Sequence, residues 1–200
     1  MTIQIGIPGF AVEPGDHICA FYLGKRERDD VLLPFLRTGL HAGEKCLCIV
    51  DTTEPADLVS SIGTELDVDG FISSQQLDVR TPAIAYLRSG GFSMDQLLGF
   101  LRETVAGAIA DGYGFVRVAA EASWLLGGPP DADEFLEYES ELNRFAPQFP
   151  QAVLCLYDLE RFGGGLIVEL LKTHPKLLLG GLVLENPHFL SPDEYRAAKS

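Results

Sequence analysis

The sequences HICAFYL at His17–Leu23 and AVLCLY at Ala152–Tyr157 decide the fold class. Each is a short run that is apolar on both faces of a β-strand, which is typical of a strand covered by helices on both sides of its sheet. QLDVRT at 76–81 is a weaker strand pattern, which we expect nearer an edge. Three further apolar runs are KCLCIV (Lys45–Val50), FVRVAA (Phe115–Ala120) and GLVLEN (Gly181–Asn186).

Helical patterns separate the strands. Capping boxes at Ser93-x-x-Gln96 and Asp131-x-x-Glu134 open two amphipathic helices. Three shorter patterns are Asp29–His41, Asp57–Leu66 and Leu166–His174. Pro34 lies inside the first of these, so we expect that helix to start late or to kink. Strands alternating with helices predict a mainly parallel, three-layer α/β domain with helices on both faces.

Composition excludes several classes of protein. The chain has 200 residues, 15 basic and 29 acidic, and a formal net charge of −14, which argues against direct nucleic-acid binding because that needs clustered Lys and Arg. The N-terminus lacks a secretory signal, and the longest apolar stretch, Leu177–Leu184, is too short to span a membrane. Four cysteines do not make a disulfide scaffold in a chain of this length. We therefore expect a cytoplasmic protein with no membrane partner.

Nucleotide-binding and catalytic motifs are missing. The loop after the first strand, Phe21–Arg28, has one glycine and an acidic residue where a P-loop needs glycines, a lysine and a hydroxyl. No G-x-G-x-x-G, G-x-S-x-G or H-E-x-x-H motif is present. Gly163–Gly165 precedes a helix, but a flexible turn explains it equally well. The sequence therefore predicts that the protein is not an enzyme and has no cofactor. A catalytic pair of carboxylates, Glu121 and Asp158, would require the fold to bring them close together, and the sequence does not give their separation.

Ligands of parallel sheets bind at the carboxyl ends of the strands, so the residues there are candidates for a binding site. The candidates are His17, Cys19, Tyr22, Glu121, Trp124, Tyr157, Asp158 and Arg161. The aromatic members would form apolar walls, and the histidine, thiol and carboxylates would be the few polar anchors that such pockets use. Residues 125–130, LLGGPP, combine glycines with prolines and are a candidate moving part.

His17 and Cys19 leave three interpretations open. Residues i and i+2 of a strand share a face, so the two side chains would line one pocket or bind one metal ion. The other three histidines lie in unrelated segments and no C-x-x-C pair is present, so we predict no metal site. The third interpretation is a buried thiol beside a histidine that bonds a backbone carbonyl.

Four more residues are assigned structural or supporting roles. Arg117 shares a strand face with Glu121, which predicts either a buried ion pair or a place in the site. Glu139 and Asn143 lie one turn apart on a helix face and are of a kind that is most often solvated. Asn186 precedes a proline and is expected to be extended or in a turn. Asp158 and Arg161 are expected to pair within a turn.

The ordered set of these segments resembles the MEDS family, the methanogen/methylotroph sensory domains first named from a dichloromethane-responsive regulator. The segments that carry the resemblance are Gly15–Cys19, Pro34–Leu40, Gly43–Cys46, Val116–Trp124, Glu137–Glu139, Cys155–Asp158, His174–Pro175, Gly180–Gly181 and Glu185–Pro187. It covers about Pro14 to Tyr195, so we expect one domain over 14–195, an N-terminal extension over 1–13 and a C-terminal tail over 196–200.

The resemblance implies a RecA/KaiC-like core without its phosphate-binding loop and a role in sensing small hydrocarbon derivatives. Members are commonly joined to histidine kinases, DNA-binding helices or anti-sigma modules. No such module follows Ser200, so we expect signalling through a separate partner of that kind or through a change of the chain's own oligomeric state. The alternatives are a ligand-free adaptor, whose acidic surface meets a basic partner, and a residual nucleotide-binding protein.

Overall fold

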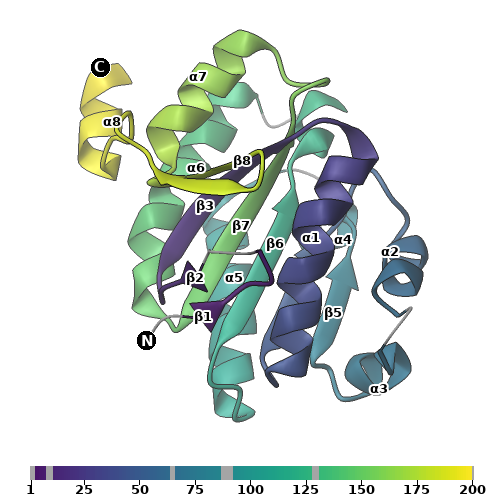
Figure 1. The fold of residues 1–200 in the computed structure, drawn as a ribbon. Helices are drawn as coiled ribbons and strands as arrows, with labels where there is room; N and C mark the ends of the chain where they lie inside the picture. Colours follow the sequence, from purple (N-terminus) through teal and green to yellow (C-terminus); the bar gives the residue numbers. More distant parts are fainter. Residues whose placement is uncertain (1–2, 8–10, 64–65, 87–91, 128–130, 200) are drawn as a thin grey trace.

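The computed structural model describes residues 3–7, 11–63, 66–86, 92–127 and 131–199. They form a seven-stranded sheet and a small ribbon of β1 (Ile3–Gln4) and β2 (Ala11–Val12) (Figure 1). The strands of the large sheet are β3 (Asp16–Tyr22), β4 (Lys45–Ile49), β5 (Leu77–Arg80), β6 (Val116–Glu121), β7 (Gln151–Asp158), β8 (Lys176–Leu179) and β9 (Leu182–Glu185). Their order is β5-β4-β6-β7-β3-β8-β9, and every pair is parallel except β8 with β9. The predicted mainly parallel sheet, with the weak strand at an edge, is confirmed.

Helices cover both faces of the sheet, as predicted (Figure 1). One face, called here the α1 face, packs against α1 (Gly24–His41), α2 (Pro55–Ile62) and α3 (Val68–Ser73). The other, the α6 face, packs against α4 (Pro82–Ala85), α5 (Met94–Ala110), α6 (Ala132–Phe145), α7 (Gly164–Thr173) and α8 (Pro192–Lys199). Ser93 and Asp131 cap α5 and α6 through their side chains, so both capping boxes start helices where the sequence predicts them.

Strand alternation decides which face each site residue reaches. In β3, Cys19 and Phe21 belong to the core of the α6 face, whereas Ile18 and Tyr22 belong to the core of the α1 face. This two-residue period places neighbouring residues on opposite sides of the sheet. Residues that follow one another at the carboxyl edge therefore enter different environments.

The prediction for the first helix is wrong in its start. α1 begins at Gly24, five residues before the predicted Asp29, and runs without interruption through Pro34. Proline removes the hydrogen bond to the carbonyl of the residue four positions earlier, here Asp30. Asp30 is exposed, so water can bond that carbonyl and the helix continues.

The apolar stretch Leu177–Leu184 forms a β-hairpin rather than a single strand. β8, which the sequence analysis missed, pairs with β9 through a two-residue turn with Leu179 opposite Leu182. Gly180 and Gly181 occupy the turn with φ of +58° and +76°, which only glycine adopts readily. Gly-Gly between two apolar runs is itself a hairpin signal.

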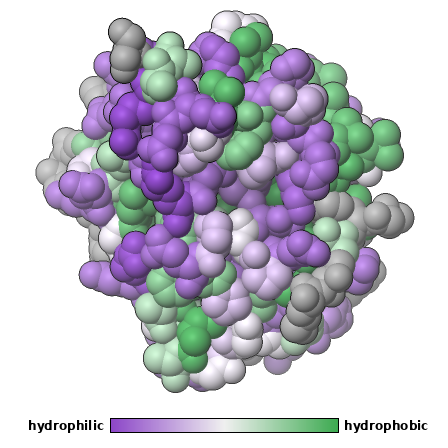
Figure 2. Space-filling view, turned by 90° about the vertical axis from the view of Figure 1, so that its left-hand side faces the viewer, coloured by the Kyte–Doolittle hydropathy of each residue, from purple (hydrophilic) through white to green (hydrophobic). Residues whose placement is uncertain are grey.

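The first and the last described segments of the chain pack onto the domain. Ile3, Ile5 and Val12, in the segment predicted as an extension, are buried in the core of the α1 face, and α8 runs to Lys199. The side of the molecule where α6, α7 and α8 lie is largely hydrophilic, with small separate apolar patches (Figure 2). Within the described residues, every helix is too short or too polar to cross a lipid bilayer.

Candidate functional site

The sheet divides the predicted site residues between its two faces. The side chains of Tyr22, Glu121 and Asp158 lie on the α1 face or at its rim. The residues on the α6 face are His17, Cys19 and Tyr157, with Trp124 packed beside them from the short helix η1 (Ser123–Gly127). Arg161 is exposed in the turn after β7. The carboxyl edge thus carries two separate environments rather than one pocket.

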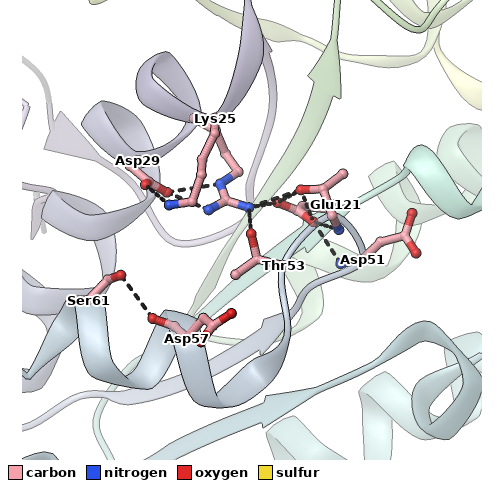
Figure 3. A network of polar contacts seen from close by, with 9 residues as sticks. Lys25, Asp29, Asp51, Thr53, Asp57, Ser61 and Glu121 are labelled. Atoms are coloured by element: carbon pink, nitrogen blue, oxygen red, sulfur yellow. Dashed lines mark hydrogen bonds and ion pairs between the residues drawn. The ribbon is translucent and has the colours of Figure 1, made fainter.

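On the α1 face, a buried ion pair joins Arg28 of α1 to Glu121 at the end of β6. Arg28 Nη1 donates to Glu121 Oε1 over 2.8 Å, and the two side chains are at most 1% exposed. Glu121 Oε2 also accepts from the backbone N–H groups of Asp51 and Thr52, each over 2.7 Å (Figure 3). The hydroxyls of Thr52 and Thr53 complete the network. Glu121 therefore fastens the loop after β4 to α1.

Arg117 does not pair with Glu121, so the ion pair expected between them is wrong. Arg117 Nε donates to Glu44 over 2.5 Å, and its other nitrogens donate to the carbonyls of Phe35 and Gln4, each over 2.8 Å. Arg117 and Glu121 do share a strand face, but four residues of strand span about 13 Å. Each side chain takes partners at its own end of β6.

Carboxylates occupy the place where a nucleotide phosphate would bind. The N-terminus of the helix after a parallel strand is an anion site, because its first N–H groups lack helical partners. Here Glu27 accepts from Leu23 N–H over 2.9 Å, and Asp158 accepts from Gly24 N–H over 3.5 Å. Asp158 also accepts from Glu160 N–H. The expected pair of Asp158 with Arg161 is therefore replaced by a bond to the backbone of the same turn.

Magnesium–ATP is accordingly expected not to bind in the micromolar range. A phosphate chain would have to displace two carboxylates from the start of α1 and lie beside them without a P-loop lysine. Isothermal titration calorimetry of the full chain measures this. Micromolar affinity would revive the nucleotide-binding alternative.

A cleft of about 310 Å³ opens beside the start of α1, at the carboxyl end of β3. Its lining comprises Ile7, Phe21, Tyr22, Glu27, Asp30, Val31, Gly180 and Gly181. The walls are apolar and aromatic, and two carboxylates stand among them. The Tyr22 hydroxyl is buried and has no hydrogen-bond partner in the described part of the chain.

On the α6 face, four polar side chains converge from four elements. They are His17 of β3, Glu139 of α6, Cys155 of β7 and His174 at the end of α7, and we call them the α6-face cluster. All are buried, and their nearest polar atoms lie within 4.8 Å of one another. From the sequence, Glu139 is expected to be solvated, but its side chain is buried in this cluster. The histidines approach each other with ring centroids 4.2 Å apart.

Electrostatics makes Glu139 the anion of this cluster. Burial by itself would raise the pKa of Glu139, but hydrogen bonds to His17 and His174 outweigh it and lower the pKa to about 2. Burial, and then the neighbouring His17, lower the pKa of His174. Burial, and then Glu139, raise the pKa of the Cys155 thiol. A carboxylate therefore sits among groups that favour their neutral forms.

Asn143 and Asn186 support this cluster from outside. Asn143 Nδ2 donates to the carbonyl of Thr173 over 2.7 Å, and its Oδ1 lies 3.0 Å from His17 Nδ1. Of the three interpretations given for His17, the one with a backbone-carbonyl partner is therefore wrong. Asn186 Nδ2 donates to the carbonyl of His174 over 2.7 Å. Both amides fix the segments that carry the histidines.

Trp124 belongs to an aromatic group next to the cluster. The centroid of its ring lies 5.1 Å from the ring centroid of Tyr86 and 5.8 Å from that of Phe135. The cavity beneath it measures about 10 Å³, room for about one water, and Glu139 and Cys155 line that cavity too. Of the predicted moving segment 125–130, residues 128–130 lie outside the described part of the chain.

The sequence analysis missed Arg28, Cys155 and His174 as site residues. It noticed all three, in the loop after the first strand, inside a strand and at a helix end, but as parts of separate segments. Cys19, which it selected, is buried on the same face, while the thiol next to His17 is that of Cys155, 3.4 Å away on the adjacent strand. The parallel pairing of β3 with β7 sets Cys155 opposite Cys19, and the sequence carries no signal of that pairing.

The fold and this edge define a class of protein: a RecA/KaiC-like α/β domain in which carboxylates replace the phosphate-binding loop. Solved structures support the fold. The flagellar accessory protein FlaH from Methanocaldococcus jannaschii superimposes with a TM-score of 0.61 at 11% identity, over 91% of this chain and 83% of that one. A KaiC-like protein from Pyrococcus horikoshii gives 0.65 at 12% identity, over 88% and 79%.

The chain belongs to the MEDS family, the methanogen/methylotroph, DcmR sensory domain, whose profile matches residues 16–175. It is also 31% identical over 173 residues to the transcriptional repressor DcmR of Methylorubrum extorquens, a match over 84% of this chain. The match spans 61% of the length of that repressor. The family description makes the chain a sensory domain.

Proposed function

We propose that this sensory domain binds a small, mostly apolar molecule in the cleft at the end of β3 and relays its presence to a separate signalling protein. The proposed role is binding without catalysis. The partner would be a histidine kinase, an anti-sigma factor or a transcription regulator, and the similarity to a repressor supports the last of these.

The cleft is the observation that carries the proposal. Its volume of about 310 Å³ lies at the lower limit of small-molecule sites. Phe21, Tyr22 and Val31 provide apolar wall, while Glu27 and Asp30 disfavour anions. The cavity beneath Trp124 is far smaller, about 10 Å³. Between the two environments of the carboxyl edge, the α1 side offers the room.

The polar groups that line the cleft are the carboxylates of Glu27 and Asp30. The Tyr22 hydroxyl is buried near Glu121 and Asp158, so Tyr22 provides apolar wall rather than a polar contact. Carboxylates accept hydrogen bonds. The favoured class is therefore small hydrocarbon derivatives with one polar or polarisable group.

Filling the cleft tests the proposal. Small halomethanes and alcohols, with dichloromethane, dibromomethane and methanol as probes, are expected to raise the unfolding temperature of the wild-type chain. Val31→Trp should abolish that rise, because the larger ring occupies the space that Val31 borders. Differential scanning calorimetry at several probe concentrations measures the shift, because binding to the native state alone raises the unfolding temperature.

Val168→Trp is the matched control. Val168 is 54% exposed on α7, so the added ring leaves the cleft free and the probe-induced shift should persist. Trp124→Ala should also retain the shift, whereas its loss there would move the site to the α6 face. If no probe shifts the wild-type chain, the small-molecule proposal is wrong.

The hairpin β8–β9 favours the second candidate function, a ligand-free adaptor. β9 pairs only with β8 among the described strands, and Leu179, Leu182 and Leu184 are each about half exposed or more. Exposed leucines on an edge strand are typical of a protein-contact surface. An adaptor would bind its partner equally well with and without the probes, which separates it from a sensor.

A further inference from the structure

We propose that the α6-face cluster binds one divalent transition-metal ion, zinc in the first instance, through one atom of each of its four side chains. This proposal does not depend on the cleft, because the cluster lies on the other face of the sheet.

The spacing of the four groups fits a tetrahedral ion. Glu139 Oε2 lies 3.2 Å from His17 Nε2, 3.2 Å from His174 Nε2 and 3.6 Å from Cys155 Sγ. The distance from His17 Nε2 to Cys155 Sγ is 3.4 Å. Zinc bonds of 2.0 to 2.3 Å in tetrahedral geometry place nitrogen and oxygen ligands about 3.3 Å apart, and nitrogen and sulfur about 3.5 Å apart. Four of the six distances between ligand atoms therefore match a zinc site, and the other two, from His174 to His17 and to Cys155, are within 4.8 Å.

The hydrogen bonds around His174 direct its free nitrogen toward the centre. His174 Nδ1 lies 2.9 Å from the carbonyl oxygen of Leu170, which can only accept, so Nδ1 carries the proton. Nε2 is the nitrogen that faces the centre of the cluster, 3.2 Å from Glu139 Oε2, and a metal ion bound there would replace that contact. A histidine bonded to a carbonyl through one nitrogen is the usual arrangement of a metal ligand.

His17 is arranged in the same way by Asn143. Asn143 Nδ2 donates to the carbonyls of Ser140 and Thr173, over 3.0 and 2.7 Å. Its amide orientation is thereby fixed, and Oδ1 accepts from His17 Nδ1 over 3.0 Å. His17 Nε2 is consequently the nitrogen that faces the centre of the cluster, 3.2 Å from Glu139 Oε2.

The carboxylate of Glu139 is buried at the centre of the cluster, where the effective dielectric constant is low and an ionised group is stabilised by a nearby cation. Its contact with the Cys155 thiol measures 3.6 Å. A dipositive ion bound by the thiolate and the carboxylate would leave no net charge.

The set of ligand atoms selects the class of ion. Two imidazoles with a thiolate and a carboxylate suit zinc and its first-row neighbours, whereas magnesium and calcium prefer oxygen ligands alone. The ligands come from two strands and two helices. The bound ion would therefore tie α6 and α7 to β3 and β7.

Metal analysis of the full chain tests the site. Protein produced in zinc-supplemented medium is expected to contain about one zinc per chain by plasma mass spectrometry. Protein produced with cobalt in place of zinc should show the visible absorption of tetrahedral cobalt and a thiolate-to-cobalt charge-transfer band. Loading during synthesis is needed because the cluster is buried.

Cys155→Ser should lose the charge-transfer band and reduce the metal content to less than a tenth of the wild-type level. Cys48→Ser is the matched control, since Cys48 is equally buried but lies on the α1 face. Should Cys155→Ser fail to fold, the wild-type cobalt spectrum decides, because only a thiolate ligand produces that band. The metal site is overturned if the wild-type chain contains only trace metal after growth with zinc and with cobalt. It is also overturned if Cys155→Ser and Cys48→Ser contain equal amounts of metal. The four side chains would then share a proton in place of the ion.

The metal test and the cleft test fail independently. Val31→Trp is expected to leave the metal content at the wild-type value, because Val31 packs with the core of the α1 face. If Val31→Trp loses the probe-induced shift of the unfolding temperature but keeps the full metal content, the substitution has affected the cleft and not the metal site.

Discussion

Replacing Glu121 with alanine should lower the free energy of unfolding by about 3 to 5 kcal/mol, as is typical when one partner of a buried ion pair is removed. Arg28 would keep Asp29, 2.6 Å from its Nη2, as its remaining carboxylate partner among the described residues, and its buried Nη1 would lose Glu121. The N–H groups of Asp51 and Thr52, which both donate to Glu121, would also lose their acceptor. Urea unfolding followed by circular dichroism measures the change.

Two controls separate the buried charge from packing. Glu141→Ala removes a carboxylate that pairs with Arg144 and Arg196 on the surface, and should cost less than about 1 kcal/mol. The double variant Arg28→Met, Glu121→Leu should recover part of the loss, because no unpaired charge remains. If Glu121→Ala costs as little as Glu141→Ala, the ion pair does not hold this edge together.

Gly39→Ala should destabilise the chain by about 1 to 3 kcal/mol, the usual cost of overpacking. A Cβ at Gly39 would lie 2.6 Å from Cδ and Nε of Arg117 and 2.9 Å from Cys46 Sγ. Arg117 cannot move away freely, because it holds Glu44 and two backbone carbonyls. Thermal and urea unfolding measure the effect.

Gly99→Ala is the matched substitution and should have the opposite sign. Gly99 also lies inside a helix, but a Cβ there meets nothing within 4 Å. Alanine is favoured over glycine in a helix interior by about 1 kcal/mol. If both substitutions stabilise the chain, the close approach of α1 to Arg117 is not real.

Both predictions concern the α1 face, where buried polar groups join the elements in addition to the apolar core. Glu121 connects the carboxyl edge to α1, and Arg117 connects the amino edge to α1 and to the first strand of the chain. A rigid helix between them gives the cleft a fixed wall. Residues Glu27 and Val31 of that wall lie on the same helix as Gly39.

Local patterns in the sequence predicted six of the seven strands of the large sheet, all except β8, and most of the helices. Apolar runs on both faces predict buried parallel strands because each such strand must be covered twice. The capping boxes at Ser93 and Asp131 predict helix starts because side chain and backbone lie within four residues of each other. The start of α1 was less predictable, because Pro34 argues locally against a helix that tertiary packing stabilises.

Partners across long sequence distances were decided by the tertiary structure. The sequence placed Arg117 and Glu121 on one strand face, yet each bonds to a different segment because their separation along β6 exceeds the reach of their side chains. His17 and His174 are 157 positions apart in the sequence but only 4.2 Å apart between ring centroids. Residue type and periodicity determine which face a side chain takes. Which other side chains share that space depends on how the strands are ordered, and no local pattern encodes that order.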